Sequence, residues 1–305
     1  MPKEKPTERV TAEDMAKKQR EISVAEFFEK NRHLLGFDNP RKALLTAIKE
    51  AVDNALDASE EAKILPEISV EIIEMSENRY RIIIEDNGPG IVKAQIPKIF
   101  AKLLYGSKFH RLRQSRGQQG IGISAAVMFA QLTTGRPTKI ISKTGSDKPA
   151  HYMELHLNTQ TNNPEIIIDE IREWNKEHGT KIEMDLEGSY IKGSQSVDEY
   201  LRQTAIINPH ATIIYTNPKA EQFIYARATD SLPKEPLEIK PHPYGLELGM
   251  LIKMLKNSES KTLTAFLTSD LSRVGSGTAK EICDTALIDP KKKPEEVSMQ
   301  EAEKN

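Results

Sequence analysis

A stripe of oxygen-bearing side chains follows one side of a stretch with helical spacing, "ALLTAIKEAVDNALDAS". These residues stand at offsets of 0, 3, 4 and 7, which brings them together on a helix: Glu50, Asp53, Asn54 and Asp57. Such periodicity is typical of an amphipathic surface helix. However, Asp and Asn are poor residues for a helix interior, and carboxylates at this spacing repel each other. Since Lys49 alone is adjacent and is expected to point off this face, the uncompensated oxygens predict contact with a hard cation such as Mg²⁺.

Asp86 ends an apolar stretch that is typical of a strand, and "NGPG" follows it at once. Glycines tolerate positive φ and let the backbone approach a ligand closely. A carboxylate fixed at such a point can accept a hydrogen bond from an exocyclic amine, such as that of adenine. "DNG" is also a common signal of a simple turn, so this stretch alone leaves both interpretations open.

A second glycine cluster, "GQQGIG" (117–122), opens another stretch with helical spacing. Consecutive backbone N–H groups at the start of a helix bind anions, helped by the helix dipole. Basic residues precede the cluster: Lys108, Arg111, Arg113 and Arg116. The cluster does not follow a strand, as the dinucleotide-binding fingerprint requires, and a charged exposed loop would also explain the arginines. It is the order of the acidic helix, the Asp-glycine turn, the basic loop and this cluster that predicts a nucleotide cradle.

The elements that must position these residues are strands and helices in alternating runs. Strands are predicted at 67–73, 80–86, 138–143, 151–158, 165–171, 180–186, 211–215 and 222–228. Helices are predicted at 23–36, 41–59, 95–104, 121–131 and 197–206. Runs of strands with helices between them indicate an α+β fold, a layered sandwich in which a mixed sheet carries helices on one face.

Four regions are predicted along the chain. Residues 1–20 are charged and contain proline, which is typical of a flexible arm. Residues 21–229 carry the layered sandwich. Residues 230–290 begin with a proline-rich linker and continue with three short helices. Residues 291–305 are charged and nearly devoid of apolar side chains, so we expect a disordered tail.

The composition excludes several classes of protein. The 305 residues are 38% hydrophobic, and 43 Lys and Arg are balanced by 45 Asp and Glu, so the whole chain lacks the basic excess of many nucleic-acid-binding proteins. The single cysteine, Cys283, excludes an intrachain disulfide and a cysteine-based zinc site, and we expect it to be buried. No apolar run is long enough to span a membrane, and the N-terminus lacks the apolar core of a secretory signal, so we expect a cytoplasmic protein.

Four motifs in order resemble those of the GHKL ATPase superfamily, which includes type II topoisomerases, ninety-kilodalton heat-shock chaperones, mismatch-repair ATPases and histidine kinases. "EAVDNALDAS" is similar to its first motif, "DNGPG" to its second, "GQQGIG" to its third and "HGT" (178–180) to its fourth. The resemblance implies the layered sandwich of that superfamily, the Bergerat fold, with ATP as ligand and Mg²⁺ as metal.

Within the superfamily, the chain is similar to the B subunits of topoisomerase VI, a type IIB DNA topoisomerase, from about residue 20 to residue 290. The similarity rests on "LLYGSKFHRLRQSRGQQGIGISAAVMFAQLTTG", on "AIINPHATI" and on the helical unit after the sandwich, which that family describes as helix–two-turns–helix. The resemblance implies ATP-driven closure of a homodimer, with residues 1–20 exchanged as a strap. It also implies double-stranded DNA and a DNA-cleaving A subunit as partners, in a chromosome-associated heterotetramer of two A and two B subunits.

The resemblance implies a role for each matching residue. Glu50 would be the general base that activates water, and Asn54 would be the Mg²⁺ ligand. Asp86 would contact adenine, with Gly90 and Thr180 helping through water.

The remaining implied contacts lie in and after the basic loop. Ser107 and Lys108 would begin a lid over the nucleotide. The next residues would wrap the phosphates through backbone N–H groups: Gly117, Gln118, Gln119, Gly120, Ile121, Gly122, Ile123 and Ser124.

One departure from the family bears on activity. In the family, a transducer domain follows the helical unit and supplies a lysine to the γ-phosphate and the connection to the A subunit. Nothing after residue 290 is similar to it, so we expect a truncated or naturally incomplete B subunit. Such a chain would bind ATP, whereas its dimerisation and ATP turnover would be impaired.

Two alternatives stay open at the level of sequence. The first is another GHKL ATPase: a chaperone, a mismatch-repair protein or a histidine kinase, for which His33 is the one histidine before the motifs. The second is a module that binds nucleic acid or a protein partner and whose glycines are structural. In residues 245–290 acidic side chains offset the basic ones, so no basic stripe indicates DNA binding there.

Overall fold

The structure is a computed structural model that describes residues 11–17, 19–106, 116, 121–237 and 239–304. Contacts divide the chain into two compact units, of which the first ends at Lys234 and the second begins at Glu235. Each unit has a hydrophobic core of its own.

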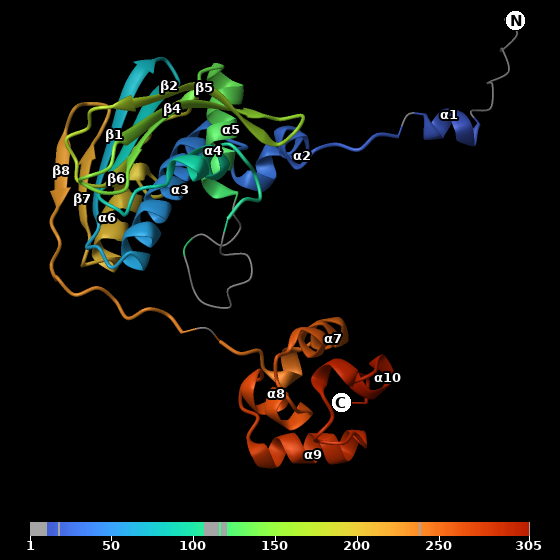
Figure 1. Cartoon of the computed structure of the whole chain (residues 1–305). Helices are drawn as coiled ribbons and strands as arrows, with labels where there is room; N and C mark the ends of the chain where they lie inside the picture. Colours follow the sequence, from blue (N-terminus) through green and yellow to red (C-terminus); the bar gives the residue numbers. More distant parts are fainter. Residues whose placement is uncertain (1–10, 18, 107–115, 117–120, 238, 305) are drawn as a thin grey trace, which may run out of the picture. The chain divides into compact units, whose positions relative to one another are not determined.

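The first unit is built on one eight-stranded sheet (Figure 1). In chain order the strands are β1 (Glu67–Ser76), β2 (Arg79–Asp86), β3 (Thr138–Lys143), β4 (Ala150–Asn158), β5 (Asn163–Arg172), β6 (Gly179–Glu187), β7 (Thr212–Thr216) and β8 (Gln222–Tyr225). Their order across the sheet is β5-β4-β3-β6-β2-β1-β7-β8. The β1–β7 pair is parallel and the other neighbours are antiparallel, so the sheet is mixed.

Helices cover one face of this sheet (Figure 1). The main ones are α3 (Pro40–Glu61), α5 (Gly122–Thr134) and α6 (Val197–Ile207), and the short α4 (Ile96–Phe100) packs against α5 and β5. The strands supply a matching apolar face, because Ile68, Val70 and Ile72 alternate along β1 and are all buried. The fold predicted from the sequence, an α+β layered sandwich with helices on one face, is confirmed.

Helix α3 carries the polar stripe, and its ends and its buried face fix where that stripe lies. Asn39 caps the helix by accepting a hydrogen bond from the N–H of Arg41 (2.9 Å), and Pro40 fits the first turn, where no N–H partner is needed. The buried apolar face consists of Ala43, Leu44, Ala47, Ile48, Ala51, Val52, Ala55 and Leu56. Because this face packs in the core, the rotation of the polar side chains about the helix axis is set.

The N-terminal region consists of short helices: α1 (Ala12–Ala16), α2 (Val24–Lys30) and the 3-10 helix η1 (Arg32–Leu35). The single helix predicted over 23–36 is therefore two elements, because the chain leaves the α-helical conformation at Asn31. The second of these elements, η1, ends at Gly36, the glycine at which the helix was predicted to stop, and this residue has a left-handed φ of 79°. Part of the predicted flexible arm is helical, and residues 1–10 lie outside the described residues.

The regular elements in the described part of the second unit are helices: η3 (Pro243–Gly245), α7 (Leu248–Asn257), α8 (Leu263–Ser269), α9 (Ser276–Ala286), η4 (Pro294–Glu296) and α10 (Met299–Ala302). The three short helices predicted here are α7, α8 and α9. Leu255, Phe266 and Leu267 lie in their shared core with Cys283, which is buried, as expected.

The prediction of a disordered tail over 291–305 is wrong for its described part, 291–304. Ser298 and Glu301 form a reciprocal capping box at the start of α10, and Lys292 Nζ donates to Glu301 (2.7 Å). Ala302 is buried against the core of the second unit. A segment with few apolar residues can fold in this way because it packs on a core that the preceding helices already form.

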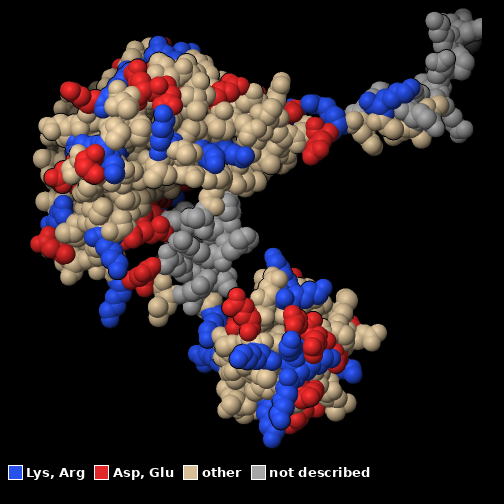
Figure 2. Space-filling model, viewed as in Figure 1, with Lys and Arg blue, Asp and Glu red and all other residues tan. Residues whose placement is uncertain are grey.

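On the face of each unit that Figure 2 shows, the described residues carry both signs of charge side by side. No helix in the described part of the chain is long and apolar enough to cross a membrane.

Candidate functional site

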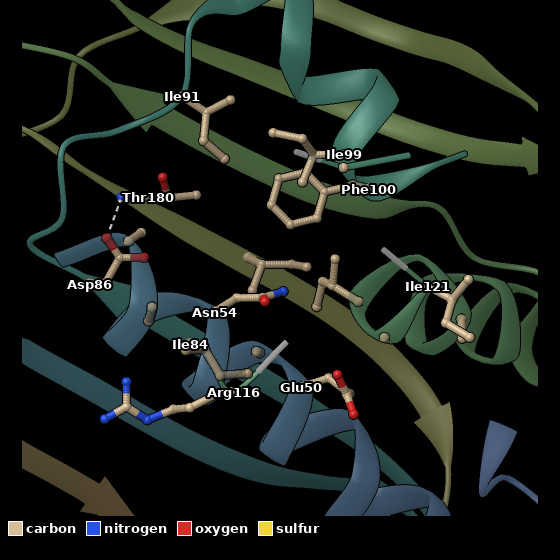
Figure 3. A pocket seen from close by; sticks show the side chains of 18 of the residues that line it. Glu50, Asn54, Ile84, Asp86, Ile91, Ile99, Phe100, Arg116, Ile121 and Thr180 are labelled. Carbon is tan, nitrogen blue, oxygen red and sulfur yellow. Dashed lines mark hydrogen bonds between the residues drawn. The ribbon is translucent and has the colours of Figure 1, made fainter. Parts of the chain in front are cut away.

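A cavity of about 730 Å³ opens between α3, the middle of the sheet, the loop after β2 and the start of α5 (Figure 3). Its apolar wall includes Leu34, Leu35, Phe37, Ile84, Ile91, Ile99, Phe100, Ile121 and Ile182. Its polar lining is made by Glu50, Asn54, Glu61, Asp86, Arg116 and Thr180. Apolar walls with a few placed polar groups are typical of a small-molecule site of this size.

The polar stripe of α3 is divided by the fold. Glu50 and Asn54 line the cavity, and neither side chain has a hydrogen-bond or ion-pair partner among the described residues. Asp53 instead turns away, where it accepts a hydrogen bond from the hydroxyl of Tyr200 (3.0 Å) and pairs with Lys49 (3.3 Å). Two members of the stripe are thus left to meet a ligand.

The fourth member, Asp57, is nearly buried and pairs with Arg116 (2.9 Å). The prediction that the whole stripe is uncompensated and meets a cation is therefore wrong for Asp53 and Asp57, and Lys49 does reach Asp53. The reason is that Tyr200 and Arg116 come from segments far away in sequence, so the spacing within the helix does not reveal them.

Asp86 lies at the end of β2, and its two carboxylate oxygens differ in their contacts. Its Oδ1 accepts hydrogen bonds from the N–H groups of Gly88 (2.8 Å) and Thr180 (3.2 Å), the second of which is drawn in Figure 3. Its Oδ2 has no hydrogen-bond partner in the described part of the chain. Burial raises the pKa of Asp86 to about 6, although these two hydrogen bonds act in the opposite direction.

The turn after Asp86 is held from two sides. The side chain of Asn87 accepts from the N–H of Glu67 (2.8 Å) and donates to the carbonyl of Leu65 (3.1 Å). On the other side, Nδ1 of His178 lies 2.8 Å from the carbonyl oxygen of Gly88. The "HGT" motif therefore braces the "DNG" turn and brings the N–H of Thr180 to Asp86.

Gly90 is required by its surroundings. Its φ is +71°, and a Cβ atom there would lie 2.0 Å from the carbonyl oxygen of Lys143. The next residue is fixed as well, because the N–H of Ile91 donates to Ser142 Oγ (2.8 Å), which also lies 2.9 Å from Thr180 Oγ1. The close approach of this turn to β3 closes one side of the cavity.

Glu50 lies directly against the start of α5. A Cβ atom on Gly122 would lie 1.7 Å from Glu50 Oε2, so glycine is the residue that leaves room for this carboxylate. Burial raises the pKa of Glu50. A partly desolvated carboxylate that has no partner in the described part of the chain is suited to accept a proton from a bound molecule.

The two glycine segments lie at different turns of α3. Gly122 meets Glu50, whereas a Cβ atom on Gly88 would lie 3.3 Å from Ser59 Oγ. These two helix positions are nine residues apart, which is about 14 Å along an α-helix. The cavity therefore has the Asp86 turn at one end and the start of α5 at the other.

The structure brings most of the described candidate residues to one place. Those that line the cavity are Glu50, Asn54, Asp86, Gly90, Ile121, Gly122, Ile123 and Thr180. Ser124 does not, because its side chain is buried in α5 and its hydroxyl donates to the carbonyl of Ile121 (3.1 Å). The other candidates lie outside the described residues: Ser107, Lys108, Gly117, Gln118, Gln119 and Gly120.

The sequence interpretation missed the apolar wall of the cavity. Ile99 and Phe100 belong to a predicted helix, and Leu34 and Leu35 end another, but apolar periodicity does not distinguish a cavity wall from a core. It also grouped Arg116 with the basic residues that lead into the glycine cluster, with a charged exposed loop as the alternative, and did not place it beside α3. The charge of Asp57 and Glu60 on the neighbouring helix face was the available signal for its place.

Residues 39–186 match the family described as "Histidine kinase-, DNA gyrase B-, and HSP90-like ATPase". This region is a GHKL ATPase domain. The resemblance inferred from the four motifs is confirmed, and all four motifs of the GHKL ATPase domain contribute residues to the cavity or to its bracing.

The chain is also similar over nearly its whole length to proteins named as the B subunit of type 2 DNA topoisomerase 6. The one from Methanosarcina barkeri is 56% identical over 96% of this chain and 47% of its own length. The one from Archaeoglobus fulgidus is 52% identical over 95% of this chain and 48% of its own. The chain thus spans about half the length of the curated relatives it matches.

Among solved structures, the topoisomerase IV ATP-binding domain of Francisella tularensis, in complex with a small-molecule inhibitor, has a TM-score of 0.46 and 21% identity. The match covers 68% of this chain and 54% of that chain.

Proposed function

We propose that the cavity binds ATP with its adenine at the Asp86 end. The observation that carries the proposal is Asp86 Oδ2, which has no hydrogen-bond partner in the described part of the chain. It can accept a hydrogen bond from the exocyclic amine while the N–H groups of Gly88 and Thr180 hold Oδ1. The apolar wall, including Ile84 and Phe100, suits the faces of a planar base. The family match supports the choice of ATP.

The triphosphate would then extend along α3 toward the start of α5. Backbone N–H groups at the N-terminal end of that 13-residue helix suit an anion. Asn54 Oδ1 has no partner among the described residues and lies on the wall between the two ends, so it suits Mg²⁺, which is often held by one or two protein oxygens together with substrate phosphates. When bound, Mg²⁺ would neutralise charge on the phosphates.

Hydrolysis would use Glu50 as general base. Its carboxylate accepts a proton from a water molecule whose oxygen attacks the γ-phosphorus, and the bond from that phosphorus to the bridging oxygen of ADP breaks. The products are ADP and inorganic phosphate. The support for this role is that Glu50 is a partly desolvated carboxylate beside the start of α5, with no hydrogen-bond or ion-pair partner among the described residues.

We further propose that the chain is the ATP-binding part of a B subunit of the topoisomerase VI type, because its relatives carry that name. Its partners would be a DNA-cleaving A subunit and double-stranded DNA, and ATP would close a homodimer within a heterotetramer of two A and two B subunits. Residues 1–20 would be the strap, 21–229 the ATPase domain and 230–290 the helix–two-turns–helix domain. The assembly would act on the chromosome in the cytoplasm.

A comparison of nucleotides tests the adenine assignment. Guanine carries a carbonyl where adenine carries its amine, so Asp86 should reject GTP. Calorimetric titration should show MgATP binding at least about tenfold tighter than MgGTP, since a buried polar group without its partner costs about 1–3 kcal/mol. Equal affinity for the two nucleotides would contradict the proposed role of Asp86.

A further inference from the structure

Ser142 carries a hydroxyl group in the core beside the Asp86 end of the cavity. It follows Ile140 on the buried side of β3, and both side chains are completely buried. A hydroxyl group is costly to bury unless hydrogen bonds compensate for the water that it loses. Ser142 does not itself line the cavity, so any effect that it has on a ligand must act through the residues that it contacts.

Three contacts join Ser142 to the two segments that close the Asp86 end. Its Oγ accepts a hydrogen bond from the N–H of Ile91 (2.8 Å), which follows Gly90 in the turn after β2. The carbonyl oxygen of Gly179 lies 3.1 Å from the same Oγ, and the hydroxyl oxygen of Thr180 lies 2.9 Å from it. Ile91 and Thr180 line the cavity, and in the view of Figure 3 Thr180 lies between Ile91 and Asp86. Ser142 therefore ties the turn to the "HGT" motif.

The hydrogen bonds of Ser142 bear on the hydroxyl proton of Thr180. A hydroxyl group has one proton to donate and two lone pairs that accept. The N–H of Ile91 takes one lone pair of Ser142, so the proton of Ser142 goes either to the Gly179 carbonyl or to the Thr180 hydroxyl. In the first arrangement Thr180 donates its own proton to Ser142 and can only accept from a ligand. In the second arrangement Thr180 accepts from Ser142 and keeps its proton for a ligand.

Adenine needs a donor beside Asp86. Its amine is a donor, whereas the neighbouring ring nitrogen, N1, is an acceptor. Burial raises the pKa of Asp86 to about 6, so its carboxylate is mostly ionised at pH 7 and suits the amine but not N1. The N–H groups of Gly88 and Thr180 are already used by Asp86, and the N–H of Ile91 is used by Ser142. The Thr180 hydroxyl, in the second arrangement, can supply the donor directly or across a water molecule.

We propose that Ser142 is a positioning residue for recognition of the base: its proton goes to Thr180 when adenine binds, so that the Thr180 hydroxyl donates toward N1. This inference rests on the proposed function and adds a second determinant of the base to Asp86. The alternative is that Ser142 only holds the two segments together. The two roles differ in how much the N1 atom contributes to affinity, and this contribution can be measured.

Two variants of nearly the same shape isolate the hydroxyl group. Ser142→Thr and Ser142→Val enlarge the side chain in the same way, but only threonine keeps a hydroxyl group. Ser142→Ala adds no atoms to the core and carries the test if the larger variants do not fold. The matched control is Thr204→Val, because Thr204 is also buried and donates to a carbonyl (Tyr200, 2.8 Å) but does not line the cavity.

Calorimetric titration of the full chain compares MgATP with its 1-deaza analogue, in which a C–H group replaces N1. The unmutated chain should prefer MgATP by at least about fivefold, as expected for a typical net hydrogen bond. Ser142→Thr and the Thr204 control should keep this preference, whereas Ser142→Val and Ser142→Ala should bind the two nucleotides within about twofold of each other. Thr180→Val should lose the preference as well, and Ser142→Ala should not change the ratio further in that background, because both changes remove one interaction.

A preference for MgATP that persists in Ser142→Ala would overturn the inference, and so would a preference lost equally in Ser142→Thr and Ser142→Val. Equal affinity of the unmutated chain for the two nucleotides would overturn this inference alone, because Asp86 would still recognise the amine. A folded unmutated chain that binds no MgATP would overturn the proposed function, and this inference with it.

Discussion

The carboxylate of Glu50 lies so close to the α-carbon of Gly122 that a Cβ atom on Gly122 would stand 1.7 Å from Oε2. This contact joins the first and third motifs of the chain, which are separated by about seventy residues. It places the proposed base at the end of the helix that would hold the phosphates. The predictions below depend on this contact and on the Asp86 turn at the other end of the cavity.

Gly122→Ala should displace Glu50 and slow ATP hydrolysis by about 10- to 100-fold, since a misplacement of about 1 Å can cost that much. MgATP affinity should fall less, because the carboxylate can swing aside. Steady-state hydrolysis and calorimetry check the two effects. Gly277→Ala in α9, where a Cβ atom would meet open space, is the control and should leave both unchanged. Full hydrolysis by Gly122→Ala would count against the assigned role of Glu50.

Hydrolysis should also respond to the protonation of Glu50. Burial raises the pKa of Glu50, and the base must be ionised, so turnover should fall as pH decreases through that raised pKa, at a higher pH than an ordinary glutamate would give. Glu50→Gln should bind MgATP with nearly the affinity of the unmutated chain but hydrolyse it at least about 100-fold more slowly. Single-turnover rates across a pH series measure this, and a retained rate in Glu50→Gln would refute the assignment.

Asp86→Asn should stabilise the unliganded chain and weaken ATP binding. The pKa of Asp86 in the folded chain is about 6, above the ordinary value of 3.8. Above pH 6 the carboxyl is ionised in both the folded and the unfolded chain, and its ionisation destabilises the folded state. This loss of unfolding free energy is at most about 3 kcal/mol at pH 7. It disappears as pH falls below 3.8, the pKa that Asp86 has in the unfolded chain. Urea unfolding at pH 7 should show the variant more stable, with a smaller difference at pH 5. A variant less stable at pH 7 would contradict the sign of this effect.

Two glycines with the same backbone conformation separate strain from contact. Gly135→Ala places a side chain at φ +67° in open space, so it should cost about 1–2 kcal/mol of unfolding free energy. Gly90→Ala has a similar φ of +71° but meets the carbonyl of Lys143 at 2.0 Å, and it should cost at least about 2 kcal/mol more. It should also weaken MgATP binding, whereas Gly135→Ala should not. Equal losses of stability for the two variants would show that the close approach to β3 is unimportant.

The contribution of the metal can be isolated at Asn54. Removal of Mg²⁺ with a chelator should weaken ATP binding by the unmutated chain, because the ion would link Asn54 to the phosphates. In Asn54→Ala, binding in the presence of Mg²⁺ should be weaker, and the chelator should make a smaller further difference. If the chelator has the same effect on both proteins, Asn54 is not the ligand.

The local elements of the fold were predictable because their signals are local. Alternating apolar residues predict β1 and β2. Gly36 marks the end of the first helical segment, and the helical spacing of apolar and polar residues predicts α3. The glycines at 88, 90 and 122 were predicted to let the backbone approach a ligand, whereas in the structure a Cβ atom on each would lie within 3 Å of another protein atom. The roles of Glu50, Asn54 and Asp86 stay predictions, although all three line one cavity.

The sequence does not reveal which side chains far apart along the chain form hydrogen bonds in the folded protein. Tyr200 reaches Asp53 across 147 residues, and Arg116 reaches Asn208 across 92. Such pairs depend on the sheet order, which brings α6 beside α3. The prediction of a disordered tail was wrong for a related reason, because Ala302 packs in a core that is formed mainly by residues earlier in the sequence.

The most direct test of the account is a calorimetric titration of MgATP into the folded chain, with Asp86→Ala as the test variant and Asp230→Ala, an exposed aspartate, as the control. The account predicts saturable binding that Asp86→Ala weakens by at least about tenfold and Asp230→Ala leaves unchanged. Binding that is absent from the folded unmutated chain, or equally strong in Asp86→Ala, would contradict it.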